Sequence, residues 1–158
     1  MQEYRRQIAY LYAYEQGVKM RSAGFVKVEV RGKECRMGIY LKSDCHSAGE
    51  EPGKVYVYFA CYDRMIGIAL GELKNQNGIL EWQGSMDSEN VLDKGIRMAD
   101  TRGIWVRRTG QREYIAEWDD ATVDVRRFLL YPAGGKKCIR CPRLEECERN
   151  HENAFDRR

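Results

Sequence analysis

Polar and apolar residues alternate along much of the chain, and this period of two restricts the fold more than any other feature. Residues 25–31, for example, read FVKVEVR. Successive side chains of a strand point to opposite faces of a sheet, so such a segment buries one face and exposes the other. The same reasoning predicts eight strands, at residues 8–15, 25–31, 35–42, 55–62, 65–74, 79–83, 103–108 and 112–118.

Short polar connections between these segments predict antiparallel neighbours. RGKE joins the second segment to the third, NQNG joins the fifth to the sixth, and TGQ lies between the last two. Asn-Gly between two alternating runs is typical of a tight β-hairpin. Residues 87–100 tolerate a helix, but no long crossover helix is expected. The sequence therefore predicts an all-β fold, an antiparallel sandwich or barrel of about eight strands.

Small residues occupy one face of the fifth predicted strand. Gly67, Ala69 and Gly71 follow each other at every second position. A face without bulk leaves room for a neighbouring layer, so we expect a large ring to lie close to it.

The composition and the periodicity of the sequence change after Pro132. The β-patterned part, residues 1–132, is followed by Ala-Gly-Gly and then by a polar segment with little strand periodicity. Residues 133–158 contain too few apolar residues to form a core of their own. We therefore expect one β domain at 1–132 with a short Cys/His-containing tail at 133–158.

Charge and hydropathy exclude some classes of protein. The net charge is only +3, and the basic pairs have acidic neighbours, which does not favour a dedicated nucleic-acid-binding protein. No apolar run reaches the roughly 20 residues of a membrane helix, so no membrane association is expected. The first residues, MQEYRRQIAYLYAYEQG, lack the features of a signal peptide, which predicts a cytoplasmic location.

Three segments near the N-terminus form a recognisable pattern: Tyr-Leu-Tyr-Ala-Tyr-Glu at 10–15, Gly-Phe-Val-Lys-Val-Glu at 24–29 and Cys-Arg-Met at 35–37. This pattern resembles an uncharacterised domain family of anaerobic Firmicutes. Residues 66–71 and 118–120 are similar to later parts of the same pattern. The resemblance covers most of residues 4–132 and implies an intracellular β-rich domain. It implies no catalytic residue, because the family has no known activity.

The tail contains the strongest candidate for a metal site. Cys138, Cys141, Cys147 and His151 follow the spacing Cys-x2-Cys-x5-Cys-x3-His. A Cys-x2-Cys turn brings two thiolates to one ion, and residues four apart share one face of a helix. Three thiolates and one imidazole suit a structural zinc ion. The spacing is also similar to part of the SPASM-type cluster-binding segment, so an iron–sulfur cluster is a less favoured alternative.

Other readings of the cysteines stay open. The tail cysteines could be free thiols or could form disulfides. Cys45-His46 lies in a predicted loop and could complete or replace a ligand, although an ordinary loop is the simpler interpretation. Cys35 and Cys61 fall on the apolar phase of their strands and are interpreted as small buried hydrophobic residues.

Two groups of tyrosines suggest a binding surface. Residues 10, 12 and 14 share one strand face, and residues 56, 58 and 62 share another. Such rings can stack bases or sugars, but they can equally pack under loops or at a subunit contact. A nucleic-acid surface would need these tyrosines and the four arginines at 5, 6, 107 and 108 on one exposed face.

Enzymatic readings have less support. The chain has only two histidines, His46 and His151, and no nucleophile–base arrangement is evident. The expected function is a non-enzymatic domain that binds a protein partner or associates with itself, with a possible metal clip in the tail. The alternative is a module that binds single-stranded nucleic acid.

Overall fold

The computed structural model describes residues 4–42, 53–91, 96–108 and 112–130, and the described residues form ten strands in one sheet. No helix within these residues is both long and apolar enough to span a membrane. The strands are β1 (Tyr4–Glu15), β2 (Val18–Arg31), β3 (Glu34–Lys42), β4 (Lys54–Cys61), β5 (Arg64–Glu72), β6 (Lys74–Gln76), β7 (Ile79–Asp87), β8 (Thr101–Arg108), β9 (Arg112–Glu117) and β10 (Phe128–Leu130).

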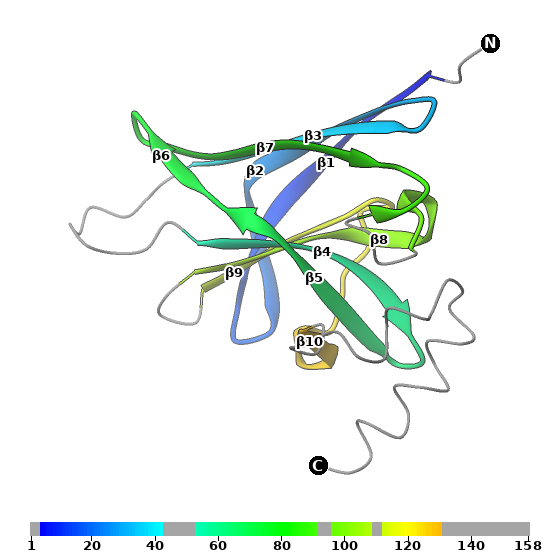
Figure 1. Cartoon of the computed structure of the whole chain (residues 1–158). Coiled ribbons are helices and arrows are strands. Elements are labelled where there is room, and N and C mark those ends of the chain that lie inside the picture. The colour runs from blue at the N-terminus through cyan, green and yellow to red at the C-terminus, as the bar shows by residue number, and fades with distance from the viewer. Residues whose placement is uncertain (1–3, 43–52, 92–95, 109–111, 131–158) are drawn as a thin grey trace.

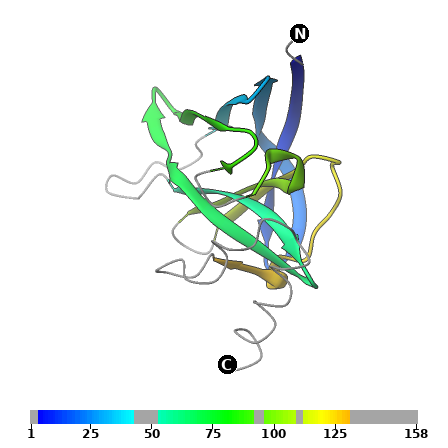
Figure 2. The same cartoon turned by 45° about the vertical axis from the view of Figure 1, so that its right-hand side comes forward.

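The sheet curls because one stretch of chain joins its two ends. Its order is β10-β5-β4-β8-β9-β1-β2-β3-β7-β6. β5 and β6 are separated only by Leu73, yet β6 is one edge and β5 lies beside the other. Figures 1 and 2 show β5 and β6 as one diagonal run across the molecule. Leu73 is buried, and its amide donates to the Gly53 carbonyl oxygen at 2.9 Å.

The all-β prediction is confirmed, but the number of strands is ten in the described residues rather than about eight. Each of the eight predicted segments overlaps one strand, except that 65–74 covers most of β5 and the first residue of β6. The two additional strands, β6 and β10, have three residues each, too few for an alternating pattern to be recognised. All ladders are antiparallel except β10 with β5.

The predicted pairing of β2 with β3 forms around the Gly32-Lys33 turn, and β8 and β9 also pair as predicted. The predicted hairpin between residues 65–74 and 79–83 is wrong for most of its length, because β5 pairs with β4 and β10. Only the short β6, which begins at Lys74, pairs with β7 around Asn77-Gly78. Asn77 and Gly78 have φ angles of 56° and 90°, the left-handed backbone that a type I′ turn requires at both central residues. The described residues 87–91 and 96–100 contain no α-helix; Met98–Asp100 form a 3-10 turn, so the helix-tolerant pattern was misleading there.

Two separate apolar clusters hold the fold. The larger cluster fills the inside of the curled sheet and draws on β1–β5 and β7–β9, together with residues 91, 96 and 98. The smaller cluster lies on the outer face of β4, β8 and β9. There the segment 121–130 covers the rings of Tyr56, Tyr58 and Trp105, with Phe128 packed against Tyr58 at 4.7 Å between centroids.

Large rings do lie close to two of the predicted small residues of β5, but on opposite faces, because the register shift at Leu70 turns Gly71 toward the inner cluster. A Cβ atom added at Gly67 would lie 2.7 Å from the Trp105 ring. One added at Gly71 would lie 2.5 Å from Nε1 of Trp82. Glycine at these positions therefore lets two tryptophans approach the β5 backbone from other strands.

Candidate functional site

A splayed end of the sheet creates a cavity between β1 and the end of β9. β1 pairs with β9 only over Tyr12–Tyr14, whereas β1 continues toward Tyr4 in register with β2. The N-terminal half of β1 therefore separates from the end of β9. The amide Nε2 of Gln7 spans the gap by donating to the Trp118 carbonyl oxygen at 2.9 Å. The space that remains has a volume of about 570 Å³.

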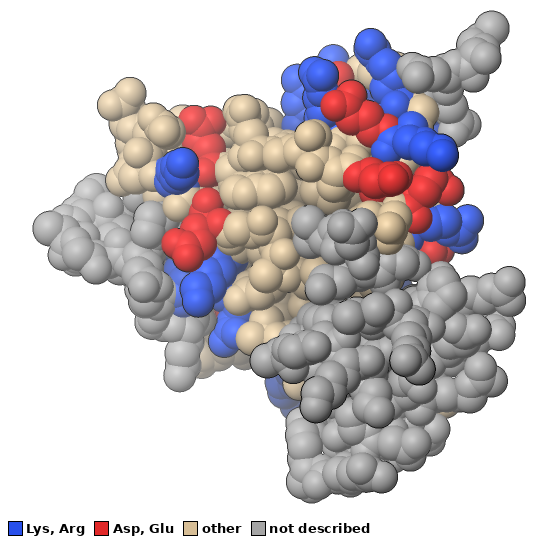
Figure 3. Space-filling model, viewed as in Figure 1, with Lys and Arg blue, Asp and Glu red and all other residues tan. Residues whose placement is uncertain are grey.

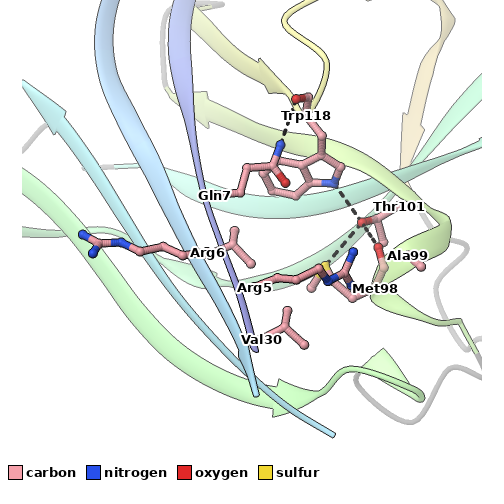
Figure 4. Close-up of a pocket in the computed structure, with 9 residues that line it drawn as sticks. Arg5, Arg6, Gln7, Val30, Met98, Ala99, Thr101 and Trp118 are labelled. Carbon is pink, nitrogen blue, oxygen red and sulfur yellow. Dashed lines mark hydrogen bonds between the residues drawn. The ribbon is translucent and has the colours of Figure 1, made fainter. Parts of the chain in front are cut away.

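The β1–β2 hairpin supplies one wall of this cavity. Arg5 and Gln7 lie opposite Val30 and Val28 in the register, on the inward phase of the strands. Both valines are buried, and they form an apolar part of this wall. In Figure 4 the Arg5 side chain points toward Met98, and the Arg6 side chain points the other way. Arg5 is exposed and thus places a permanent cation at an opening lined by both apolar and polar groups.

A hydrogen-bonded group from β8 and its surroundings forms the opposite wall. The Trp118 indole Nε1 donates to Thr101 Oγ1 at 3.0 Å. Thr101 Oγ1 in turn donates to the Met98 carbonyl oxygen at 2.6 Å. Both Met98 and Thr101 are buried. These bonds fix the indole and the 3-10 turn relative to each other, so this wall is preorganised (Figure 4).

The cysteine nearest the cavity is not an activated nucleophile. Cys35 lies opposite Val30 in the β2–β3 ladder and is fully buried. Burial raises the pKa of its thiol to about 11, against a smaller opposing effect of the Arg5 charge. The thiol is therefore protonated at neutral pH, in agreement with its interpretation as a small hydrophobic residue. Cys61 is likewise buried.

A second candidate surface lies on the outer face of β1, β2 and β3. Tyr10, Phe25 and Tyr40 lie opposite one another in one cross-strand row, and Ile8 precedes Tyr10 on the same face. Tyr10 is 55% exposed, Ile8 49% and Phe25 38%. The Phe25 and Tyr40 rings lie 5.0 Å apart. We refer to these four residues as the aromatic strip.

Charged residues beside the aromatic strip alternate in sign. Lys27 lies 4.0 Å from Glu29, and Arg36 lies 3.4 Å from Glu34. The Tyr4 hydroxyl donates to Glu29 at 2.8 Å, and this bond is the main cause of the lowered pKa of Glu29. Figure 3 shows basic and acidic side chains mixed at the end of the molecule where β1 begins. That end has no continuous region of one charge in this view.

The predicted tyrosine faces are only partly available for binding. Tyr14, Tyr56 and Tyr58 are buried in the smaller apolar cluster, in agreement with packing under a covering segment. Tyr62 lies in the turn after β4 and is 50% exposed, so it does not extend the face of Tyr56 and Tyr58.

The four arginines proposed for a nucleic-acid surface do not share one face. Arg5 lines the cavity, and Arg6 points the other way (Figure 4). Arg107 lies near the opposite end of β8 with its guanidinium 5.3 Å from the Trp105 ring, while Arg108 is buried.

The predicted metal ligands Cys138, Cys141, Cys147 and His151 lie outside the described residues, as do Cys45 and His46. Within the described ranges no group of three or more His, Cys, Asp or Glu side chains is arranged to hold a metal ion. The cavity residues Thr101 and Trp118 were not predicted as a site. They are far from Arg5 in sequence, and only the curl of the sheet brings them to it.

No protein-family model, no curated protein and no solved structure matches this chain. The resemblance of residues 4–132 to a Firmicutes domain family therefore stays a prediction.

Proposed function

We propose that this chain is a non-enzymatic assembly domain that associates with a second copy of itself through the aromatic strip. The observation that carries the proposal is the exposure of Tyr10, Ile8 and Phe25 side by side on one strand pair. Adjacent exposed apolar side chains on a sheet face are typical of interaction sites, and aromatic residues are enriched in them.

The charges around the aromatic strip favour a copy of the same chain as the partner. A two-fold interface places the same surface on both subunits, so it must be complementary to itself. Acidic and basic residues alternate next to the strip, with Lys27 beside Glu29 and Arg36 beside Glu34. A surface with both signs in alternation can pair with its own copy, whereas a surface of one sign would repel it.

Sedimentation equilibrium over a range of protein concentrations tests the proposal. We expect a concentration-dependent dimer in the wild type and a monomer in Tyr10→Glu, because a buried unpaired carboxylate opposes association. Leu130→Glu is the matched control, since Leu130 is 43% exposed on β10, far from the strip in the sheet order. A wild-type protein that stays monomeric at about 100 µM would contradict the proposal, because obligate assemblies associate far below this concentration.

The alternative function is binding of single-stranded nucleic acid. Its support is the position of Arg6 on the exposed phase of β1 near Ile8 and Tyr10, which would place a cation beside a ring that can stack on a base. Affinity for an oligothymidylate that falls steeply with added salt, and that Tyr10→Glu abolishes, would favour this alternative.

The tail is proposed to carry a structural zinc ion on Cys138, Cys141, Cys147 and His151, and an iron–sulfur cluster is the less favoured alternative. The spacing of these residues is the support for this proposal. With four protein ligands the ion would have no open position for substrate, which suits a structural role.

A further inference from the structure

We propose that the cavity between the β1–β2 hairpin and the Met98–Thr101 segment binds a small molecule with one carboxylate and an aromatic or branched apolar body. This site is separate from the aromatic strip, which lies on the outward phase of the same strands. The proposal therefore does not depend on self-association.

Arg5 is the reason to expect an anion. Its side chain is directed into the cavity, and no hydrogen bond or ion pair joins it to any other described residue (Figure 4). The walls beside it include the buried apolar side chains of Val30 and Met98. A guanidinium binds a carboxylate through two parallel N–H···O bonds, and such charge-assisted bonds gain strength where water is partly excluded.

A carboxylate fits the site better than a phosphate. Arg6, the next basic residue, also borders the cavity, but its side chain extends away from it in Figure 4. Arg5 is therefore the one guanidinium directed at this space among the residues lining it. A single guanidinium matches the one negative charge and planar fork of a carboxylate, whereas a phosphate dianion is normally held by several donors.

The remaining walls specify the body of the ligand. Val28 and Val30 form an apolar floor, and Met98 and the Trp118 indole face them across the gap. The indole is held in place by its bond to Thr101 and by the Gln7 bond to the Trp118 carbonyl. A volume of about 570 Å³ lies in the range of small-molecule pockets, so a single ring or branched chain can enter.

The test compares three compounds with the same phenyl ring: phenylacetate, its amide phenylacetamide, and phenyl phosphate, in which an oxygen joins the ring to the phosphate. Binding to the full chain is measured by calorimetry, and amide and indole NMR shifts locate the site. We expect phenylacetate to bind at least about tenfold more tightly than phenylacetamide, because a hydrogen bond to a charged partner is lost in the amide. The shifts should centre on Gln7, Thr101 and the Trp118 indole N–H.

Two variants and one control separate the roles of the cavity residues. Arg5→Gln should weaken phenylacetate binding by about tenfold or more and leave phenylacetamide unchanged. Ala99→Trp should block all three compounds, because Ala99 lines the cavity and a large ring there would fill it. Ala99 is exposed, so the substitution should not disturb the core. Arg6→Gln should bind as the wild type does.

Four results would overturn the proposal. The first two are equal affinities for phenylacetate and phenylacetamide, and tighter binding of phenyl phosphate than of phenylacetate. The third is an equal loss of phenylacetate affinity in Arg6→Gln and Arg5→Gln. The fourth is no binding of phenylacetate at about 10 mM, a concentration at which even a weak site is occupied. None of these results affects the sedimentation test of self-association, so the two proposals fail separately.

Discussion

At the scale of single residues, three neighbouring positions on β4, β8 and β9 place a glycine between a buried tyrosine and a buried carboxylate. Tyr58, Gly103 and Glu117 lie opposite one another in adjacent ladders. Because Gly103 has no side chain, the Tyr58 hydroxyl reaches over it and donates to Glu117. Arg102 donates to the other carboxylate oxygen at 3.2 Å. Each oxygen of the Glu117 carboxylate therefore accepts a hydrogen bond, although the side chain is only 1% exposed.

Glu117 should make the stability of this protein fall as the pH rises. Burial raises the pKa of Glu117 above its usual value, against the opposing effects of Tyr58 and Arg102. A folded state that holds the proton more tightly than the unfolded chain loses stability from about pH 4.3, the ordinary pKa of glutamate, upward through the folded pKa. Glu117→Gln removes this ionisation, so the unfolding free energy of the wild type minus that of the variant should decrease over that window.

Urea unfolding at several pH values measures this difference. Other carboxylates, such as Asp124, are present in both proteins and cancel in the subtraction. A difference that increases with pH would contradict the prediction and would mean that the bond to Arg102 outweighs the cost of burial.

Gly103 should tolerate no side chain. A Cβ atom at this position would lie 1.9 Å from the Ala116 carbonyl oxygen and 2.9 Å from the Tyr58 hydroxyl. The first contact is with backbone of a central strand, which cannot move without disturbing the β8–β9 ladder. We expect Gly103→Ala to lower the unfolding free energy by about 3 kcal/mol.

Gly84→Ala is the matched substitution for comparison. A Cβ atom there would lie 2.7 Å from the outer edge of the half-buried Trp82 ring, and a side chain can turn aside more easily than backbone. We expect a loss of about 1 kcal/mol. Equal losses in the two variants, measured by urea unfolding, would show that the β8–β9 backbone yields more readily than its position suggests.

At the scale of elements, the segment 121–130 acts as a cover for the outer face of the sheet. Asp124 begins its single 3-10 turn by accepting from the Arg126 amide at 3.0 Å. Phe128 then packs against Tyr58 and Trp105, with centroid distances of 4.7 Å and 5.1 Å. The smaller apolar cluster depends on this segment, since Tyr58 and Trp105 would otherwise face water.

Phe128→Ala should weaken this cover. Removing a buried ring that contacts two others costs about 3 kcal/mol of unfolding free energy, from the lost burial and the cavity left behind. Trp105 should also become more exposed, which shifts its fluorescence to longer wavelength. Leu130→Ala is the control and should cost less than about 1 kcal/mol, because Leu130 is 43% exposed. Similar losses in both variants would argue against a cover anchored by Phe128.

At the scale of the whole molecule, the tail and the β domain should behave as independent parts. We expect protein purified without oxygen to contain about one metal ion per chain, colourless if it is zinc and brown if it is an iron–sulfur cluster. Cys141→Ser should release the metal, and metal analysis would detect this. The unfolding free energy of the β domain should change by less than about 0.5 kcal/mol, because the described strands already bury two apolar clusters of their own.

Cys45→Ser is the control for the tail site and should retain the metal if the four tail residues are sufficient. A metal-free wild-type protein, or a disulfide between two tail cysteines in freshly prepared reduced protein, would contradict the proposed site. Loss of metal in Cys45→Ser would instead place Cys45 among the ligands.

The sequence by itself determined the local features of the fold. Alternation placed eight of the strands, since a half-buried strand exposes every second side chain whatever its neighbours are. Asn77-Gly78 specified its hairpin because few other residues adopt the left-handed backbone of a type I′ turn. The small residues of β5 predicted a close ring, and Gly67 does receive Trp105. Each of these signals acts over a few residues and can be read without knowledge of the rest of the chain.

The tertiary structure alone decided which face became a core and where a cavity opened. The alternation of Tyr56 and Tyr58 is the same whether they face water or lie under residues 121–130, and only the return of that segment buries them. The cavity likewise exists because β1 pairs only with β2 from Tyr4 to Leu11 and meets β9 only from Tyr12 onward. That divergence places Arg5 and Trp118 at the same cavity, although more than a hundred residues separate them in the sequence. A local sequence pattern cannot predict a contact at that separation.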